Sequence, residues 1–254
     1  MAQVDRVALI TGAAGAIGSA TAVHLARRRV TVALADAIPT QAVAGRVEAA
    51  GGRCKQFALN VTRRDEIDAI VAQTLAAYGR IDILVNVAGI VSFGSAADLA
   101  PAEWDRVLDI NLKGTFQCCQ AVMPAMKAQR FGRIINLGSV LGKNGGNARP
   151  WLDAGEQRAS GNVAYGVSKA GVHAITAYLA RELAPFATTV NAVAPGPVAS
   201  AMTTNLSPSL TALIPLGRMG TPEDVAAVIG FLASDEAGFV TGEILDVNGG
   251  MWCD

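Results

Sequence analysis

The chain has 254 residues, of which 51% are hydrophobic and 17% are charged, and its 21 basic residues balance 21 acidic ones. This composition supports one large domain with a substantial core and leaves little material for a disordered tail. The zero net charge and the lack of a basic stripe argue against nucleic acid as a partner, and two histidines are too few for a histidine-rich metal site.

Short apolar runs alternate with longer helical patterns along the chain. Strands are predicted at Val7–Ile10, Val30–Ala35, Lys55–Leu59, Ile81–Val87, Arg133–Leu137, Thr188–Val193 and Glu243–Val247. Helices are predicted at Ala16–Arg28, Pro39–Ala50, Arg63–Tyr78, Glu103–Arg130, Val163–Ala184 and Pro222–Ser234. The helix that starts at Glu103 is expected to bend near Asn111 or Pro124. Two further stretches, Gly142–Asn162 and Pro195–Gly220, are expected to be irregular.

This alternation predicts an α/β fold of Rossmann type, with a doubly wound parallel sheet of about seven strands and helices on both faces. The predicted strands are apolar almost throughout, as expected when both faces of a sheet are covered. Because no linker rich in serine, proline or glycine interrupts the pattern, residues 1–254 are predicted to form a single domain.

The cysteine usage indicates a reducing compartment. None of the four cysteines, Cys54, Cys118, Cys119 and Cys253, forms a CxxC pair, so no disulfide framework is expected. Cys118 and Cys119 are interpreted as small buried apolar residues. The N-terminus has no signal pattern and no apolar run is long enough to span a membrane. A cytoplasmic protein without a membrane partner is therefore expected.

A glycine cluster, Gly12, Gly15 and Gly18, lies between the first predicted strand and the first predicted helix. Glycines there permit a tight turn and let a pyrophosphate approach the backbone, while the helix N-terminus offers free N–H groups. The GxxxGxG spacing differs from GxGxxG, so a glycine-rich turn that binds no ligand remains the alternative.

Asp36 ends the second predicted strand, 18 residues after Gly18. A carboxylate at this place accepts hydrogen bonds from the ribose hydroxyls of an adenosine and repels a 2′-phosphate. Ala14 offers no basic partner for such a phosphate. The pattern therefore favours NAD over NADP, the alternative being an aspartate that only caps the next helix.

Tyr165 and Lys169 share one face of a predicted helix, because they are four residues apart. A nearby ammonium stabilises a phenolate and is expected to lower the pKa of the tyrosine, so that the phenol exchanges a proton near neutral pH. The interconversion of an alcohol and a carbonyl beside a hydride donor requires such a group. The alternative is an ordinary surface pair.

Over essentially its whole length the sequence resembles the short-chain dehydrogenase/reductase family, closest in pattern to its 3-oxoacyl-reductase-like and NAD-dependent alcohol dehydrogenase members. The residues that carry the resemblance are Thr11–Gly18, Asp36, Asn60, Val61, Asn86–Gly89, Asn111, Ser139, Tyr165, Lys169, Pro195, Gly196, Thr241, Gly242 and Val247–Gly250. The resemblance implies a catalytic role for four of them. Tyr165 would be the acid/base, Lys169 would lower its pKa and hold the nicotinamide ribose, Ser139 would bind the substrate oxygen, and Asn111 would hold a relay water.

The resemblance also implies a set of cofactor contacts for NAD. These are Gly12, Gly15, Ile17 and Gly18 at the pyrophosphate, Asp36 at the ribose, Asn60 and Val61 at the adenine, Asn86, Ala88 and Gly89 near the adenosine ribose, Tyr165 and Lys169 at the nicotinamide ribose, and Pro195, Gly196, Val198 and Ser200 at the nicotinamide. Three positions of the sequence depart from the family pattern: Asn60 replaces a common Asp, Val87 a frequent Asn and Ser200 a usual Thr.

The largest departure is an insertion. Ser139 and Tyr165 are 26 residues apart, about twice the common family interval, and the extra residues fall within 143–162. In one interpretation this segment walls the substrate pocket, with Trp151 as a flat contact and Arg149 or Arg158 as anchors for an anionic substrate. In the other it is a solvated excursion or a cap over a neighbouring subunit. A second segment, 195–220, is predicted to be a substrate loop.

These features together predict an NAD-dependent oxidoreductase that acts on a small secondary alcohol or its ketone, in the oxidative direction. One alternative is a 3-oxoacyl-(acyl-carrier-protein) reductase, against which Asp36 argues because those enzymes generally use NADPH. Another is a non-catalytic NAD-binding sensor or scaffold. The resemblance implies a homotetramer, and no residue set has the spacing of a metal site. His173, four residues past Lys169, is interpreted as a packed residue with a catalytic role as the alternative.

Overall fold

The computed structural model describes residues 5–146, 149–199 and 211–253. In these residues one fully parallel sheet has the strand order β3-β2-β1-β4-β5-β6-β7. The strands are β1 (Val7–Thr11), β2 (Thr31–Asp36), β3 (Cys54–Ala58), β4 (Ile83–Asn86), β5 (Gly132–Leu137), β6 (Thr188–Pro195) and β7 (Ile244–Val247). The predicted seven-stranded parallel sheet is confirmed.

Helices connect the strands and cover both faces of the sheet. They are α1 (Ala16–Arg27), α2 (Gln41–Ala49), α3 (Arg64–Tyr78), α4 (Pro101–Leu108), α5 (Gly114–Gln129), α6 (Leu141–Asn144), α7 (Ala154–Ala159), α8 (Val163–Leu183) and α10 (Pro222–Leu232). Short 3₁₀ turns occur at η1 (Ala96–Asp98) and η3 (Ala184–Phe186), and a π turn at η2 (Asp109–Lys113).

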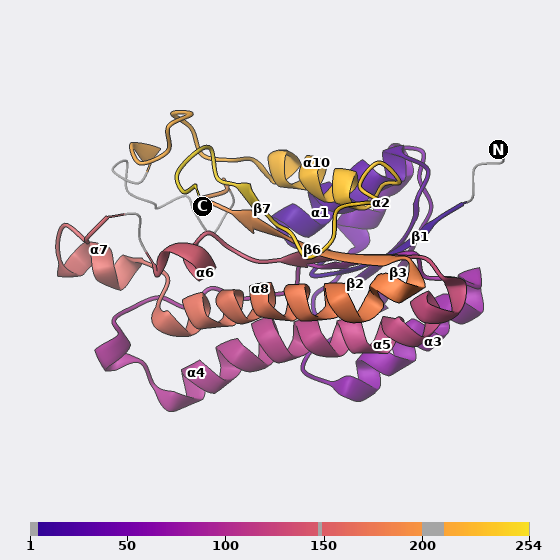
Figure 1. Cartoon of the computed structure of the whole chain (residues 1–254), viewed down its shortest axis with the longest axis horizontal. Coiled ribbons are helices and arrows are strands. Elements are labelled where there is room, and N and C mark those ends of the chain that lie inside the picture. Colours follow the sequence, from indigo (N-terminus) through magenta and orange to yellow (C-terminus); the bar gives the residue numbers. More distant parts are fainter. Residues whose placement is uncertain (1–4, 147–148, 200–210, 254) are drawn as a thin grey trace.

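The core is divided into two layers by the sheet. Helices α1, α2 and α10 pack on one face, and α3, α5 and α8 pack on the other, as Figure 1 shows. Each layer buries aliphatic side chains of the strands, such as Ile10 and Val32 on one side and Leu84 and Ile134 on the other. Strands that lie between two helical layers favour apolar residues on both faces, which explains the hydrophobic runs of β1 and β2, whereas the edge strand β3 exposes Lys55 and Gln56.

The strand order reverses between β1 and β4, which are neighbours in the sheet. In open α/β sheets a ligand binds at the carboxyl ends of the strands where this reversal occurs. Thr11 at the end of β1 is in register with Ala35 of β2 and with Asn86 of β4, so the segments that follow these three strands meet at one edge. This edge is where the predicted cofactor residues are expected to gather.

Two predicted helices differ from those observed. The helix predicted from Pro39 begins at Gln41, because the Ile38 N–H donates to the Asp36 carboxylate and residues 37–40 form a turn around it. The helix predicted as Glu103–Arg130 is two helices joined by the π turn that contains Asn111. The expected bend near Asn111 is thus a change of helical hydrogen bonding, and π turns often accompany functional sites.

The segment predicted to be irregular, Gly142–Asn162, contains helical structure. The sequence reading missed α7 because this helix has only six residues and no apolar periodicity. Asp153 starts it by accepting hydrogen bonds from the N–H groups of Gly155 and Glu156 at 2.7 and 2.9 Å. In Figure 1 α7 lies at the end of the molecule, beyond α6 and the start of α8.

Candidate active site

The glycine turn after β1 has a backbone shape that other residues do not fit. Gly12 has φ +67°, and a Cβ at this position would lie 2.5 Å from the Ala88 backbone nitrogen. A Cβ on Gly18 would collide with the Gly12 carbonyl oxygen. Gly15 starts α1 without a side-chain cap, which leaves the first N–H groups of the helix available to a ligand. The turn therefore fits the pyrophosphate of a dinucleotide.

Asp36 is held rigidly at the end of β2. One carboxylate oxygen accepts from the Ala14 N–H at 2.9 Å and the other from the Ile38 N–H at 3.1 Å. Each oxygen keeps a further lone pair, and the side chain remains half-buried beside a cavity of about 270 Å³. A fixed carboxylate at this place suits the two hydroxyls of a ribose and disfavours a phosphate there.

Other predicted cofactor residues lie at the same edge, with side chains in different roles. Ala88 faces the Gly12 turn, and the Cβ position of Gly89 is 3.1 Å from Asn111 Oδ1 and 3.5 Å from Lys169 Nζ. The residues 88–89 thus connect the glycine turn with the catalytic lysine. Ile17 is half-buried in the first turn of α1.

Three predicted contacts are already engaged with the protein. Asn60 is exposed and accepts from the N–H and hydroxyl of Thr62. Val61 is buried against Gly114 at the start of α5. The Asn86 side chain points into the core, where it donates to Asn136 Oδ1 at 2.9 Å and to Cys119 Sγ at 3.3 Å. Asn86 therefore braces β4 against β5, and its carboxamide is turned away from a ligand at the edge.

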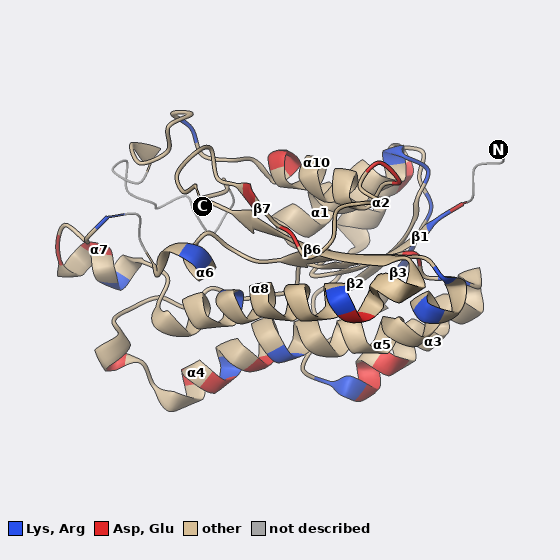
Figure 2. Ribbon diagram, in the orientation of Figure 1, with Lys and Arg blue, Asp and Glu red and all other residues tan. Residues whose placement is uncertain are grey.

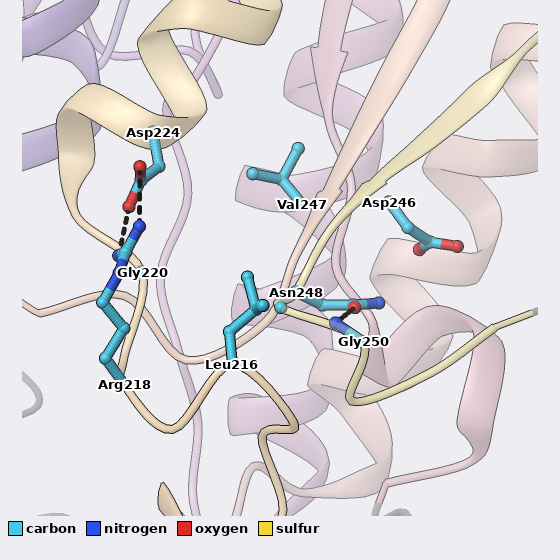
Figure 3. A pocket seen from close by; sticks show the side chains of 9 residues that line it. Leu216, Arg218, Gly220, Asp224, Asp246, Val247, Asn248 and Gly250 are labelled. Carbon is cyan, nitrogen blue, oxygen red and sulfur yellow. Dashed lines mark hydrogen bonds and ion pairs between the residues drawn. The ribbon is translucent and has the colours of Figure 1, made fainter.

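The segment after β6 forms the opposite side of the edge. The Pro195 carbonyl accepts from Val140 N–H at 3.0 Å, Gly196 N–H donates to Val247, and Val198 pairs with Gly220. Ser200 lies outside the described residues. Beyond Gly196 a cavity of about 300 Å³ opens between residues 216–224 and the end of β7. Figure 3 shows that its cation, Arg218, is turned back onto Asp224, so this cavity does not present a free positive charge.

Ser139 and Tyr165 are brought together from two elements. Ser139 follows β5 and is buried. Tyr165 is in the first turn of α8, whose N-terminus is capped by Asn162. The Ser139 hydroxyl lies near the phenol and acts on its pKa in the lowering direction, opposite to the effect of burial. Burial dominates and raises the pKa of Tyr165, so the phenol is protonated at neutral pH.

The effect of Lys169 on Tyr165 differs from the prediction. The expectation was a phenol pKa lowered by the ammonium, but Nζ lies 5.8 Å from the centroid of the Tyr165 ring and donates to the Leu137 carbonyl at 2.7 Å. The ammonium therefore donates to the carboxyl end of β5. Burial lowers the pKa of Lys169 to about 8. Tyr165 and Lys169 lie on one helix as predicted, but both side chains are protonated near neutral pH.

Asn111 is fully buried in the π turn, beside the lysine. Its carboxamide accepts from the Ile90 N–H at 2.8 Å and donates to the Ile90 carbonyl at 2.9 Å and to Ser168 Oγ at 3.0 Å. These bonds fix the segment after Gly89 to α8. Asn111 thus holds the catalytic helix in place, while the predicted relay water stays a prediction.

The C-terminal end of the insertion contacts Tyr165, the predicted catalytic tyrosine. A Cβ on Gly161 would lie 3.4 Å from Tyr165 Cδ1 and 2.8 Å from Leu141 Cδ2, so no larger residue fits there without displacement. Phe93 pairs with Gly161 across an isolated bridge, and its ring is 54% exposed. The C-terminal end of the insertion therefore lies beside Tyr165, and the pocket-wall interpretation stays a prediction.

The candidate anchors in the insertion are not equivalent. Arg149 makes a bidentate pair with Glu156 at 2.8 and 2.9 Å, which lowers the pKa of Glu156 to about 2. Trp151 donates to Ser160 Oγ at 3.0 Å and covers Gly146. Arg158 is exposed and has no ion pair within the described residues. Arg149 is thus occupied inside the insertion, which weakens its proposed role as an anchor.

Metal chemistry and cysteine chemistry find no support at this edge. The described residues contain no cluster of His, Cys, Asp and Glu that could hold a metal ion. All four cysteines are free, and burial raises the pKa of Cys118 to about 12, in agreement with its interpretation as an apolar residue. No helix in the described parts of the chain is long and apolar enough to cross a membrane.

The sequence matches known proteins over nearly its full length. A family model described as enoyl-(acyl carrier protein) reductase matches residues 12–252. A protein of Thermotoga maritima named 3-oxoacyl-(acyl-carrier-protein) reductase FabG is 42% identical over 252 residues, with 97% of each chain covered. A protein of Staphylococcus epidermidis with the same name is 39% identical, with 98% of this chain and 100% of the relative covered.

Solved structures agree with these matches. The crystal structure of a protein called gox2181 superposes with a TM-score of 0.89 at 34% identity, covering 98% of this chain and 96% of the other. A short-chain type dehydrogenase/reductase from Mycobacterium marinum gives a TM-score of 0.87 at 33% identity, with the same coverage. The fold, the glycine turn, the neighbouring Ser139 and Tyr165 side chains and these matches lead to one conclusion: the chain belongs to the short-chain dehydrogenase/reductase family and is an oxidoreductase.

Proposed function

We propose that this oxidoreductase reduces the 3-oxo group of an acyl thioester to a hydroxyl, with NADH as the hydride donor. The observation that carries the proposal is the juxtaposition of Ser139, which follows β5, and Tyr165, in the first turn of α8, where the raised pKa of the phenol keeps a proton available for delivery to a carbonyl oxygen. The names of the relatives favour a 3-oxoacyl substrate over the small secondary alcohol that the sequence analysis preferred.

The nicotinamide would supply a hydride to the carbonyl carbon. Ser139 would donate a hydrogen bond to the carbonyl oxygen and stabilise the negative charge that develops on it. Tyr165 would then donate its phenolic proton to the same oxygen, so that one hydride and one proton convert the ketone to a hydroxyl. Lys169, charged below about pH 8, would favour the phenolate that remains and would hold the nicotinamide ribose.

The preference for NADH is supported by Asp36. Its carboxylate is fixed by two backbone N–H groups at the place where an adenosine ribose would lie. A 2′-phosphate would bring negative charge against this carboxylate. The sequence analysis used Asp36 as an argument against a 3-oxoacyl reductase, but it bears only on the cofactor and leaves the catalytic residues unaffected.

The thioester could be presented by an acyl carrier protein or by coenzyme A. Two cations of the insertion already have ion-pair partners, Arg149 with Glu156 of the insertion and Lys143 with Asp246 of β7. Arg158 belongs to α7, and Figure 2 shows this helix at the same end of the molecule as α6. An acidic carrier would meet few free positive charges here, so the shared 3-oxoacyl thioester is the substrate class that we propose.

The experiment measures oxidation of NADH and NADPH with acetoacetyl thioesters of both carriers. Reduction of either thioester with NADH, at a kcat/KM above that with NADPH, supports the proposal. A higher kcat/KM for the protein-bound thioester identifies the carrier protein as the natural source, and the reverse identifies coenzyme A. If neither thioester is reduced with either NADH or NADPH, the assignment of a 3-oxoacyl thioester as the substrate is overturned.

A second candidate is NAD-dependent oxidation of a small secondary alcohol. Asp36 favours it, because NAD-linked enzymes commonly work in this direction. The same enzyme incubated with NAD and a panel of cyclic, aliphatic, sugar and hydroxy-acid alcohols discriminates the two. A kcat/KM for an alcohol that exceeds the value for every thioester would favour this candidate.

We also propose that the chain forms a homotetramer. Apolar side chains on α5 and α8 are exposed in the single chain: Phe116, Val163, Val167 and Tyr178, with exposed fractions of 40%, 44%, 40% and 80%. Exposed apolar groups on adjacent long helices favour association. Light scattering tests the proposal, and a monomeric mass at micromolar concentration would refute it.

A further inference from the structure

His173 reaches from α8 to the turn that carries Ser139. It lies four residues after Lys169, and its Nε2 accepts a hydrogen bond from the Ser139 N–H at 3.4 Å. Two glycines make room for the ring. A Cβ on Gly138 would overlap Nε2, and a Cβ on Gly142 would lie 2.9 Å from Cε1. This fit on two sides restricts the imidazole to one position, with Nε2 directed at the Ser139 backbone.

The Ser139 turn is bound to two different elements. Gly138 N–H donates to Val193 O at 2.8 Å and Val140 N–H donates to Pro195 O at 3.0 Å, so the residues on either side of Ser139 are tied to β6. The N–H of Ser139 itself is tied to α8 through His173. The N–H groups of Gly138 and Val140 therefore bind the turn to β6, and the N–H group of Ser139 binds it to α8.

This cross-link has a consequence for the reaction. Ser139 and Tyr165 must point at the same substrate oxygen, yet one follows β5 and the other is in α8. Errors of about 1 Å in such a pair reduce turnover strongly. Lys169 also joins α8 to the end of β5 through Leu137 O, but its ammonium has a role in catalysis. His173 also links the two elements, but the proposed reaction gives it no catalytic role.

We propose that His173 is a positioning residue that holds the Ser139 backbone against α8 and thereby sets the relation of the Ser139 and Tyr165 hydroxyls. It acts through Ser139 and does not touch the substrate. As an acceptor, Nε2 carries no proton, so the neutral imidazole is protonated at Nδ1 in this arrangement. The inference rests on the proposed use of Ser139 and Tyr165 and not on the identity of the thioester.

The test compares substitutions that separate packing from hydrogen bonding. His173→Leu keeps much of the volume and removes the acceptor. His173→Gln places an amide oxygen near the position of Nε2, and His173→Asn is polar but too short to reach the Ser139 N–H. The chain offers a matched control in His24, which is half-buried on α1 with its ring against Gly230 of α10. His24→Leu removes a similar ring that has no contact with Ser139.

Steady-state kinetics with a ketone that the wild-type enzyme reduces give the readout, so failure of the thioester proposal does not affect the test. We expect His173→Leu and His173→Asn to lower kcat about tenfold, with the KM of the coenzyme unchanged, and His173→Gln to recover most of the loss. His24→Leu is expected to keep the wild-type kcat.

Three outcomes would overturn the proposal: a wild-type kcat in His173→Leu, an equal loss in His173→Gln and His173→Leu, or an equal loss in His24→Leu. If His173→Leu does not fold, the comparison of His173→Asn with His173→Gln decides the question. A kcat difference of less than about twofold between these two polar variants would contradict a positioning role.

Discussion

The glycine turn after β1 and the insertion at 143–162 border the same site, but different forces determine their shapes. The turn is a backbone structure: Gly12 has a positive φ, and its missing Cβ lets Ala88 approach closely. The insertion is organised by side chains, including the Arg149–Glu156 pair and the Asp153 cap of α7. A backbone requirement restricts residue type strongly, whereas a surface ion pair contributes little and many sequences satisfy it. The cofactor side is therefore the more recognisable of the two.

Removal of the Tyr165 hydroxyl, at the site that both regions border, should have the largest effect on kcat. Tyr165→Phe deletes the proton donor, and we expect kcat to fall by about 10³ while coenzyme affinity stays near the wild-type value. Stopped-flow turnover and coenzyme fluorescence titration measure the two quantities. Tyr178→Phe is the control, because Tyr178 is 80% exposed on the same helix. Turnover by Tyr165→Phe close to that of the wild type would exclude the proposed mechanism.

A methyl group on the glycine turn tests its backbone requirement. In Gly12→Ala the new Cβ would lie 2.5 Å from the Ala88 nitrogen at a residue with φ +67°. We expect coenzyme affinity to fall about a hundredfold, because the turn must move to relieve the contact. Gly51→Ala is matched to it, since Gly51 has φ +79° and nothing within 4 Å of its Cβ position. If Gly12→Ala and Gly51→Ala have the same coenzyme affinity, the close approach of Ala88 is not the reason that residue 12 is a glycine.

Loss of the carboxylate should change coenzyme choice more than turnover. Asp36→Ala would remove the proposed ribose hydrogen bonds and the repulsion of a 2′-phosphate, so the kcat/KM ratio of NADH to NADPH should fall about ten- to a hundredfold. Asp36→Asn removes the charge and keeps one acceptor oxygen, so it retains only one of the hydrogen bonds from Ala14 and Ile38. A wild-type enzyme that already prefers NADPH would contradict this interpretation of Asp36.

The lowered pKa of Lys169 predicts that both kcat/KM and the free energy of unfolding depend on pH. Burial lowers the pKa of Lys169 from 10.5 to about 8, so kcat/KM for ketone reduction should fall about tenfold per pH unit above that value. Between pH 8 and 10.5 the unfolded chain binds more protons at this residue, so the free energy of unfolding should gain a rising contribution with pH. Urea unfolding of Lys169→Met, which lacks this contribution, isolates it from other titrating groups.

The positions of the predicted cofactor and catalytic residues in the fold could be inferred from the sequence, because their spacing follows from strands, turns and helix periodicity, while their roles stay predictions. Gly12, Asp36, Tyr165 and Lys169 all lie at the carboxyl edge of the sheet. Three-dimensional contacts were needed for the rest. No pattern indicates that Lys169 donates to Leu137 O, because the contact joins two elements 32 residues apart in the sequence, or that Arg149 pairs with Glu156, because Arg149 lies in a segment without regular periodicity.

The contribution of the insertion to substrate binding should be small at Arg149 and larger at Arg158. Arg149 is already held by both oxygens of Glu156, so Arg149→Ala should change the KM of the acyl substrate less than about twofold. Arg158 is exposed on α7, and Arg158→Ala should raise KM only when the thioester is carried by an acidic protein.

Glu156→Gln supplies the matching control, because it releases Arg149 from its ion pair and leaves the cation in place. A lower KM in Glu156→Gln together with a higher KM in Arg149→Ala would mean that the paired arginine still attracts the substrate. The insertion would then act on the substrate through a charge, as Asp36 is proposed to act on the coenzyme. Unchanged KM values in both variants would leave recognition to the apolar border formed by Phe93 and Gly161 beside Tyr165.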